Sequence, residues 1–237
     1  MPAWTVAIET VATAGSVALL SGDDVVNEHV LTADYRSART LAAGLQKIWH
    51  AANRPTVDLV AVAKGPGSFT GLRVGVITAK ALAYAWRAQL IGVNTLDAIA
   101  AQIAVPRDGQ LQVMLEAQRQ ELFVAKYQAL ENGEWERTGP DEIIAVQQWL
   151  ADLAAADNIV VAGPALKRLR DKIPPTVALA AESAWHPQAA TVGRCARKLL
   201  RAGASDELWT LLPHYLRASY AEEKKVPSTK AQVPSKE

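Results

Sequence analysis

Short apolar runs bounded by turn residues fill the first hundred positions of the chain, which is the pattern of buried strands. The runs that predict strands cover residues 4–10, 15–21, 25–31, 57–63 and 90–93. Apolar residues recur at helical spacing between and after these runs, and the stretches that predict helices cover residues 38–51, 71–88 and 94–104. The first half of the chain therefore predicts a β-β-β-α-β-α unit.

From residue 110 the same order begins again. The second set of predicted strands covers residues 111–116, 121–130, 134–137 and 159–162, and the second set of predicted helices covers 141–155, 164–172 and 188–203. The repetition predicts an α/β protein of two tandem β-β-β-α-β-α lobes, with an N-terminal lobe over 1–105 and a C-terminal lobe over 106–218. Residues 219–237 are polar and lysine-rich, which predicts a flexible tail.

Composition narrows the class of protein. The 237 residues are 50% hydrophobic, which is enough to bury one sizeable core or two small ones. The net charge of +1 shows no basic surplus for independent nucleic-acid binding. The chain has one cysteine, no signal-peptide pattern and no uncharged apolar run of roughly 20 residues that could cross a bilayer. We therefore expect a soluble, cytoplasmic protein without membrane contact, and its scattered histidines predict no metal site.

Each half carries an acid at the end of its first strand, Glu9 in VAIET and Glu116 in VMLEA. In a two-lobed α/β protein these strand ends face the cleft between the lobes, which is the usual place for a ligand. Two carboxylates that face each other there would suit a hydrated Mg²⁺ ion. Alternatively, each acid only begins a turn in water, and the pattern leaves both interpretations open.

The glycine-rich stretch GPGSFTGLRVG, residues 65–75, joins a predicted strand to a predicted helix. It matches neither the Walker A nor the Rossmann spacing, but its glycines permit positive φ and its helix begins with free N–H groups that attract anions. The alternative is a tight strand–helix connection whose glycines serve packing alone. The candidate residues for a nucleotide or phosphate are Glu9, Thr10, Gly65, Pro66, Gly67, Ser68, Phe69, Thr70, Gly71 and Glu116.

The helix after this loop has two unusual features. Arg73 lies in the first turn, where the helix dipole favours an acid, so a ligand or a partner's carboxylate would explain this cation. Gly75, Ala79 and Ala83 form a face of small residues, which lets another helix approach closely. That second helix belongs either to the same fold or to another subunit.

The loop and several flanking stretches resemble the bacterial TsaB family, also called YeaZ. The supporting stretches are VAIET…GSVALL near the start, IGVNTLDAIAAQ at 91–102, ELFVAKY at 121–127 and PHYLR at 213–217. The resemblance implies an actin-like, Hsp70-type ATPase fold of the ASKHA class with two duplicated lobes. It covers residues 1–130 well and 208–222 locally.

The resemblance also implies a function and partners. Family members act as non-catalytic scaffolds: they pair with the related catalytic subunit TsaD, a small ATPase called TsaE joins them, and the complex places a threonylcarbamoyl group on N6 of adenosine 37 in tRNAs that read codons beginning with A. Helices of the first lobe form the dimer surface, so alone the protein is expected to be a homodimer. The interface residues expected here are Leu41, Leu45, Ile48, Arg73, Val76 and Lys80.

This chain departs from the family at both acids. The family usually has Ile-Asp-Thr-Ser where this chain has Ile8-Glu9-Thr10-Val11, and Asp-Ala-Arg where it has Glu116-Ala117-Gln118. Each glutamate moves its carboxylate outward by about 1.5 Å, and a misplacement of about 1 Å can cost about 100-fold in rate. We therefore expect no catalytic residues, and a vestigial cleft that holds ATP or ADP with Mg²⁺ weakly if at all.

Two other functions are considered. The chain could be an independent ATPase or small-molecule kinase of the actin-like class that uses Glu9, Glu116 and the 65–71 loop, which steady ATP turnover by the isolated chain would indicate. It could also be an interaction domain with no part in tRNA modification, which an unchanged level of threonylcarbamoyladenosine in tRNA after its loss would indicate.

Overall fold

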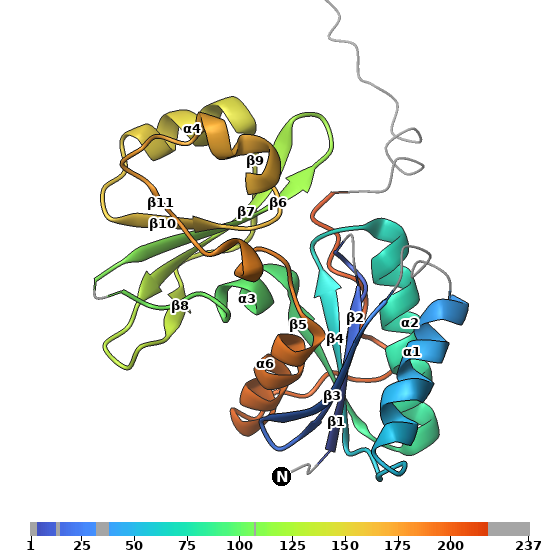
Figure 1. Ribbon diagram of the computed structural model, residues 1–237. Helices are drawn as coiled ribbons and strands as arrows, with labels where there is room; N and C mark the ends of the chain where they lie inside the picture. Colours follow the sequence, from blue (N-terminus) through green and yellow to red (C-terminus); the bar gives the residue numbers. More distant parts are fainter. Residues whose placement is uncertain (1–3, 13–14, 32–37, 107, 218–237) are drawn as a thin grey trace, which may run out of the picture.

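The computed structural model of the protein describes residues 4–12, 15–31, 38–106 and 108–217, and the predicted tail over 219–237 lies outside them. The described chain forms two lobes, each built around its own β-sheet (Figure 1). Both sheets contain parallel and antiparallel strand pairs, and helices cover their faces.

The first sheet has the strand order β3-β2-β1-β4-β5. Its members are β1 (Trp4–Glu9), β2 (Ser16–Ser21), β3 (Asp24–Val30), β4 (Leu59–Gly65) and β5 (Gln89–Asn94). The first three strands form an antiparallel meander, whereas β4 and β5 run parallel to β1. The central strand β1 therefore ends, at Glu9, beside the glycine-rich loop that follows β4.

The second sheet repeats this arrangement. Its order is β11-β10-β6-β7-β8, and its members are β6 (Gln110–Ala117), β7 (Glu121–Ala129), β8 (Trp135–Arg137), β10 (Ile159–Ala162) and β11 (Ala178–Leu179). As in the first sheet, the central strand pairs antiparallel with the next strand of the chain and parallel with the strand that follows a helix. An added strand, β9 (Glu142–Ala145), pairs with β7.

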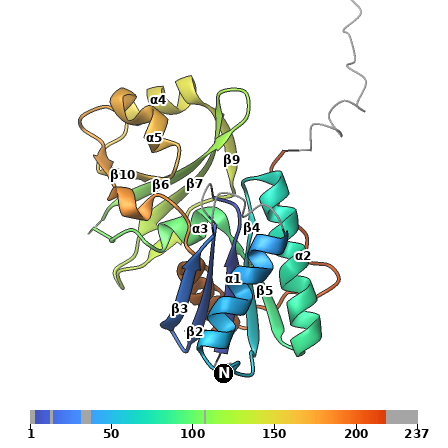
Figure 2. The same cartoon turned by 45° about the vertical axis from the view of Figure 1, so that its right-hand side comes forward.

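Helices α1 (Ala38–Ala51) and α2 (Phe69–Trp86) cover one face of the first sheet, and α6 (Ala189–Arg201) covers the other (Figures 1 and 2). The alternation along β1 explains this sandwich, since successive side chains of a strand point to opposite faces. Val6 and Ile8 lie in the core under α1 and α2, whereas Ala7 lies in the core under α6.

Two helices each pack on the sheet of the other half of the chain. Helix α3 (Thr95–Ala100) follows the first sheet in the chain, but Leu96 and Ile99 lie in a core with residues of β6 and β7. Helix α6 follows the second sheet, but it packs on β1, β2, β4 and β5. The second lobe also contains α4 (Val146–Ala154), α5 (Leu166–Leu169) and two 3-10 turns, Arg170–Lys172 and Glu182–Ala184.

Most predicted strands and helices are present within a few residues of their expected ends, and two predictions need correction. The helix expected from residue 141 begins only at Val146, because residues 142–145 form β9 on the edge of β7. Strand β11 was not predicted. The division between residues 105 and 106 stays a prediction, and the exchange of α3 and α6 means that each core draws on both halves of the chain.

Candidate functional site

A cleft of about 1180 Å³ lies between the two lobes. The first lobe lines it with Val11 and Ala12, which follow β1, and with residues 67–70 of the glycine-rich loop. The second lobe lines it with residues 115–118 at the end of β6 and with Lys167 and Arg168 of α5. Five of the ten residues predicted for a nucleotide line this cleft, namely Gly67, Ser68, Phe69, Thr70 and Glu116, whereas Glu9, Thr10, Gly65, Pro66 and Gly71 do not. The orientation of its side chains decides what chemistry it can perform.

Glu9 points into the protein and away from a shared site. Its side chain is fully buried, and its Oε1 atom accepts hydrogen bonds from the backbone N–H groups of Val11 at 2.5 Å and Ala12 at 2.9 Å. Its Oε2 atom has no hydrogen-bond partner in the described structure. Burial raises the pKa of this carboxyl to about 7, although the two backbone hydrogen bonds oppose the rise.

Glu116 is held in a different way. Its half-exposed side chain accepts a hydrogen bond from Nε of Arg168 at 2.9 Å, forming an ion pair. One acid is therefore bonded to its own strand end and the other to a cation of α5, so the two do not fit a shared Mg²⁺ ion. Within residues 4–12, 15–31, 38–106 and 108–217, no three His, Cys, Asp or Glu side chains are grouped to hold a metal.

The glycines of the loop are explained by packing against the end of β1. A Cβ atom on Gly67 would lie 1.9 Å from Cγ1 of Val11, and one on Gly71 would lie 1.9 Å from the backbone oxygen of Thr10. Thr10 secures this contact by donating a hydrogen bond from its hydroxyl to the backbone oxygen of Gly71 at 2.8 Å. These contacts leave no room for a side chain at either position, so they account for the glycines even if no ligand binds. This agrees with the alternative of a tight strand–helix connection.

The start of α2 lies at the rim of the cleft. Ser68 is the N-cap residue, and its hydroxyl accepts a hydrogen bond from the N–H of Gly71 at 3.4 Å. Phe69 is partly buried and its ring stacks on Tyr215 with 4.8 Å between centroids. The buried Pro66 follows Gly65 through a cis peptide bond.

The cations of α2 contact residues near the end of the described chain. Arg73 donates a hydrogen bond from Nε to the hydroxyl of Tyr215 at 3.0 Å, which explains its place in the first turn without a ligand. Lys80 donates from Nζ to the backbone oxygens of Trp209 and Leu211, both at 3.2 Å. Residues 208–217, which we call the C-terminal segment, therefore run along α2.

Four of the six predicted interface residues belong to the core of the first lobe. Leu41, Leu45, Ile48 and Val76 are between 0% and 7% exposed and pack with strands of the first sheet. The stripe on α1 that predicted a partner contact is therefore the face that covers its own sheet. The face of small residues on α2 is also internal, because Gly75, Ala79 and Ala83 are all buried.

A different surface of α2 is apolar and exposed. Ile77 is 66% exposed and Tyr84 67%, and they lie two helical turns apart on the same side of the helix. The C-terminal segment adds Trp209, which is 76% exposed with its ring 6.1 Å from that of Tyr84, and Leu212, which is 71% exposed. We call these four residues the α2 ridge. Their spacing on α2 was visible in the sequence, but Trp209 and Leu212 lie too far along the chain to be added to it.

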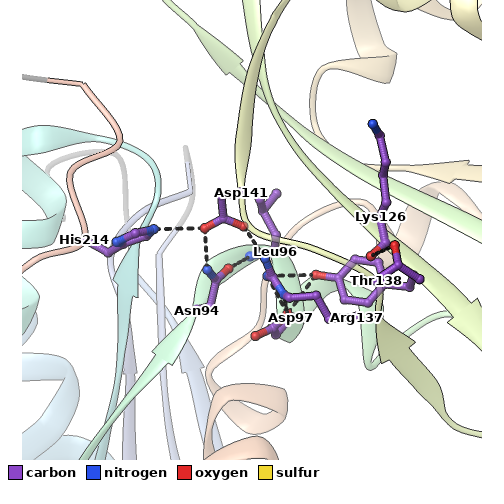
Figure 3. A network of polar contacts seen from close by, with 9 residues as sticks. Asn94, Leu96, Asp97, Lys126, Arg137, Thr138, Asp141 and His214 are labelled. Atoms are coloured by element: carbon purple, nitrogen blue, oxygen red, sulfur yellow. Dashed lines mark hydrogen bonds and ion pairs between the residues drawn. The ribbon is translucent and has the colours of Figure 1, made fainter.

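A second polar cluster, which the sequence did not predict, joins the lobes (Figure 3). The side chain of Asp141 is 3% exposed and accepts hydrogen bonds from Asn94 at 2.7 Å and from Arg137 at 2.5 Å, and His214 Nε2 lies 2.9 Å from it. Nearby, Asp97 accepts from Arg137 at 2.6 Å. Three segments that are distant in the sequence therefore meet at one buried carboxylate.

The same cluster includes Tyr127 of β7, whose hydroxyl donates to Asp97 at 2.8 Å. Burial, together with the Asp97 carboxylate, raises the pKa of Tyr127 well above its usual range, so this hydroxyl stays protonated. Two stretches that carry the resemblance, IGVNTLDAIAAQ and PHYLR, supply Asn94, Asp97 and His214 to it.

In the described part of the chain, no helix combines the length and apolar character that a membrane span requires.

Comparison with known proteins supports the resemblance. A family model described as TsaD, tRNA N6-adenosine threonylcarbamoyltransferase, matches residues 36–225. The TsaB protein of Bacillus subtilis is 30% identical over 157 residues, which cover 65% of this chain and 68% of that protein. The TsaB protein of Escherichia coli is 36% identical over 133 residues, which cover 54% of this chain and 57% of that protein.

A solved structure shares the whole architecture. YeaZ from Pseudomonas aeruginosa superposes with a TM-score of 0.73 at 26% sequence identity, covering 90% of this chain and 100% of the other. The actin-like, two-lobed α/β fold expected from the resemblance is thereby confirmed. With the family model matching most of its length, the chain belongs to the TsaB/YeaZ family, within the wider group that the TsaD model describes.

Proposed function

We propose that this protein is the non-catalytic partner subunit of the complex that installs N6-threonylcarbamoyl on adenosine 37 of tRNAs reading codons that begin with A. It binds a TsaD-like catalytic subunit and supports it as a scaffold. The observation that carries the proposal is the α2 ridge, an exposed apolar surface on a first-lobe helix. Two relatives named TsaB are tRNA threonylcarbamoyladenosine biosynthesis proteins, which supports a partner from that pathway.

The cleft supports a role without chemistry of its own. Phosphoryl transfer depends on acids that hold a metal and on a backbone that cradles phosphate. Here Glu9 accepts hydrogen bonds from two backbone N–H groups, and Glu116 forms an ion pair with Arg168. The loop glycines pack closely against the residues that follow β1. The alternative of an independent ATPase or kinase is therefore not favoured.

The α2 ridge has the composition of a binding surface. Tryptophan and tyrosine are enriched among the residues that dominate binding energy, and the exposed Trp209 and Tyr84 match that description. The ridge is also flanked by Arg73, whose guanidinium lies 5.9 Å from the centre of the Tyr215 ring. A partner that presents an apolar helical face fits this surface best.

The finer assembly follows from the same surface. We propose that two copies pair through the α2 ridge when the catalytic subunit is absent, and that a heterodimer replaces this homodimer when it is present. A TsaE-like ATPase joins the pair, and tRNA meets this chain through the complex, in the cytoplasm. Light scattering of the isolated protein tests the first step, because a monomeric mass would contradict it.

Co-purification with the TsaD-like subunit encoded by the same genome tests the proposal directly. The wild-type chain is expected to retain the subunit, and Ile77→Asp is expected to weaken binding by at least about tenfold, because it places a charge within an apolar contact. Leu130→Asp is the matched control, since Leu130 is an apolar residue of the second lobe that is 37% exposed. Equal binding by both variants would place the interface elsewhere.

The biological role needs a separate measurement. Loss of the protein is expected to lower threonylcarbamoyladenosine in bulk tRNA, measured by mass spectrometry of nucleosides. Unchanged levels would remove the protein from this pathway. Steady ATP turnover by the isolated chain that Glu9→Ala abolishes would instead support the independent enzyme.

A further inference from the structure

The C-terminal segment lies between the two lobes and contributes to both of their cores. It contains neither helix nor strand. Leu211 is 5% exposed and belongs to the core under α1 and α2, whereas Leu216 packs against the core that α3 shares with the second sheet. Only four residues, 212–215, therefore separate a contact with one lobe from a contact with the other.

On the first lobe, the segment is fixed to α2 and to the glycine-rich loop. Lys80 binds two of its backbone oxygens, and Tyr215 contacts Arg73 and Phe69. The backbone N–H of His214 donates to the backbone oxygen of Lys64 at 2.6 Å. At this crossing a Cβ on Gly65, whose φ is +115°, would lie 2.6 Å from the backbone oxygen of His214.

On the second lobe, the segment has two polar anchors. His214 contacts the buried carboxylate of Asp141, which also accepts hydrogen bonds from Arg137 of β8 and from Asn94 (Figure 3). Arg217 forms an ion pair with Glu121 of β7 and donates to the backbone oxygen of Gln118, a cleft residue. The segment is thus bonded to the part of the second lobe that faces the first.

The same ten residues carry half of the α2 ridge. Trp209 and Leu212 are exposed on it, and His214 follows Leu212 by two positions. A subunit that covers Trp209 and Leu212 immobilises the backbone between them, and this restricts the residues that contact Asp141. Binding at the ridge and the position of the second lobe are therefore connected through a continuous, short stretch of covalent chain.

We propose that the C-terminal segment couples subunit docking on the α2 ridge to the position of the second lobe, through the contact between His214 and Asp141. This inference rests on the proposed function, because the occupant of the ridge is the TsaD-like subunit. The segment has two states, bonded to Asp141 or released, and docking favours the bonded one. Since coupling between two sites is reciprocal, breaking the contact to Asp141 weakens docking as well.

The experiment uses the full chain and the TsaD-like subunit of the same genome. Hydrogen exchange is followed in residues 137–145 with and without saturating subunit, and affinity is measured by calorimetry. In the wild type, docking slows exchange in these residues. In His214→Ala, the protection disappears and affinity falls by about fivefold, the lower end of measured couplings between sites. His186→Ala, which alters an exposed histidine of the cleft away from α2, keeps both properties.

The outcomes separate this inference from the proposed function. A wild-type chain that does not bind the subunit overturns the proposed function. A wild type that binds, together with a His214→Ala variant that keeps its affinity and its protection, overturns the coupling alone. Should His214→Ala fail to fold by circular dichroism, His214→Phe takes its place, because it keeps an aromatic ring, removes the nitrogen that contacts Asp141 and is expected to reduce protection in the same residues.

Discussion

Glu9 keeps a carboxyl at the end of the first strand, where the resemblance expects an aspartate near a nucleotide. The longer side chain turns back and bonds the N–H groups of Val11 and Ala12. The carboxylate at this position therefore stabilises the local backbone, and an ionisable group is buried as a result. This burial makes the stability of the protein depend on pH.

The free energy of unfolding is expected to fall as pH rises from about 4.5 to about 7. Glu9 has a pKa of about 7 in the folded protein against an ordinary value of 4.5, so the folded state holds a proton that the unfolded state has lost across this range. The difference amounts to about 3 kcal/mol. Urea unfolding at pH 5 and pH 8 measures it.

Glu9→Gln removes this titration, so the variant is expected to gain stability relative to the wild type between pH 5 and pH 8. Glu116→Gln is the control, since it alters a half-exposed ion pair worth about 1 kcal/mol or less. A wild type and a Glu9→Gln variant with the same pH dependence would show that Glu9 is ionised at low pH in the folded state.

At the residue scale, the sequence predicted part of the cleft lining, residues 67–70 and Glu116, but not how the side chains around it are oriented. Glu9 and Glu116 were identified because strand ends can be located from apolar runs. Whether a carboxylate faces a cleft or its own backbone depends on tertiary packing, which the runs do not contain. Asp141 was missed for the same reason, because its contacts with Asn94 and His214 span 47 and 73 residues of sequence.

At the scale of elements, the different sides of α2 make different contacts. Gly71 and Gly75 pack against Thr10, which follows β1, the N-terminal turn borders the cleft, and Ile77 and Tyr84 remain exposed. Helix α1, in contrast, turns all of its large aliphatic side chains toward its own sheet. The partner surface that we propose therefore lies on α2 and the C-terminal segment and not on the predicted stripe of α1.

Leu45→Asp and Ile48→Asp are expected to unfold the first lobe without specifically breaking an interface. Both residues are at most 7% exposed, and burying an unpaired carboxylate among apolar groups costs several kcal/mol, so stability should fall by about 3 kcal/mol or more. Thermal unfolding measures this loss.

Ile77→Asp serves as the contrast in the same measurement, because its site is exposed and stability should change by less than about 1 kcal/mol. If Leu45→Asp melted at the wild-type temperature and only lost its partner, α1 would be the interface after all.

The strands that the sequence did not predict are short. Strand β9 has four residues and β11 two, and neither is long enough to show a period of two clearly. Residues 142–145 also precede a real helix, so an apolar pattern that starts at Ile143 fits either structure. Their partners, β7 and β10, decide the outcome, and partner choice is a property of the whole sheet.

At the scale of the molecule, the two lobes are not assembled from consecutive halves. The first sheet receives α6 from the end of the chain, and the second receives α3 from the middle. The internal duplication was readable from the sequence because both units repeat the same strand order. The exchange was not, because it depends on which apolar face each helix covers.

Fragments 1–105 and 106–237 are each expected to fold poorly when expressed alone. The first lacks α6 over its sheet, and the second lacks Leu96 and Ile99 of α3 in its core. Exposed apolar sheet faces cause aggregation and binding of hydrophobic dyes. Together, the fragments are expected to form a soluble complex, measured by co-expression and gel filtration.

The comparison for this experiment is a cut in the exposed turn around Gly133, which keeps α3 joined to β6 and β7 but, like the cut at 105, separates α6 from the first sheet. Two fragments from the cut at 105 that each unfold cooperatively as monomers would show that the halves are independent domains, and the exchange would then contribute little to stability.

The position of α6 near the end of the chain has a consequence for folding during translation. The ribosome synthesises the five strands of the first sheet well before residues 189–201. The sheet face that α6 covers therefore stays exposed and apolar through most of translation. Ribosome-associated chaperones bind such surfaces, and the first lobe can close only when synthesis is nearly complete. Pausing translation before codon 189 should therefore trap a chaperone-bound, protease-sensitive N-terminal lobe, whereas completion and release of the chain should allow this lobe to fold.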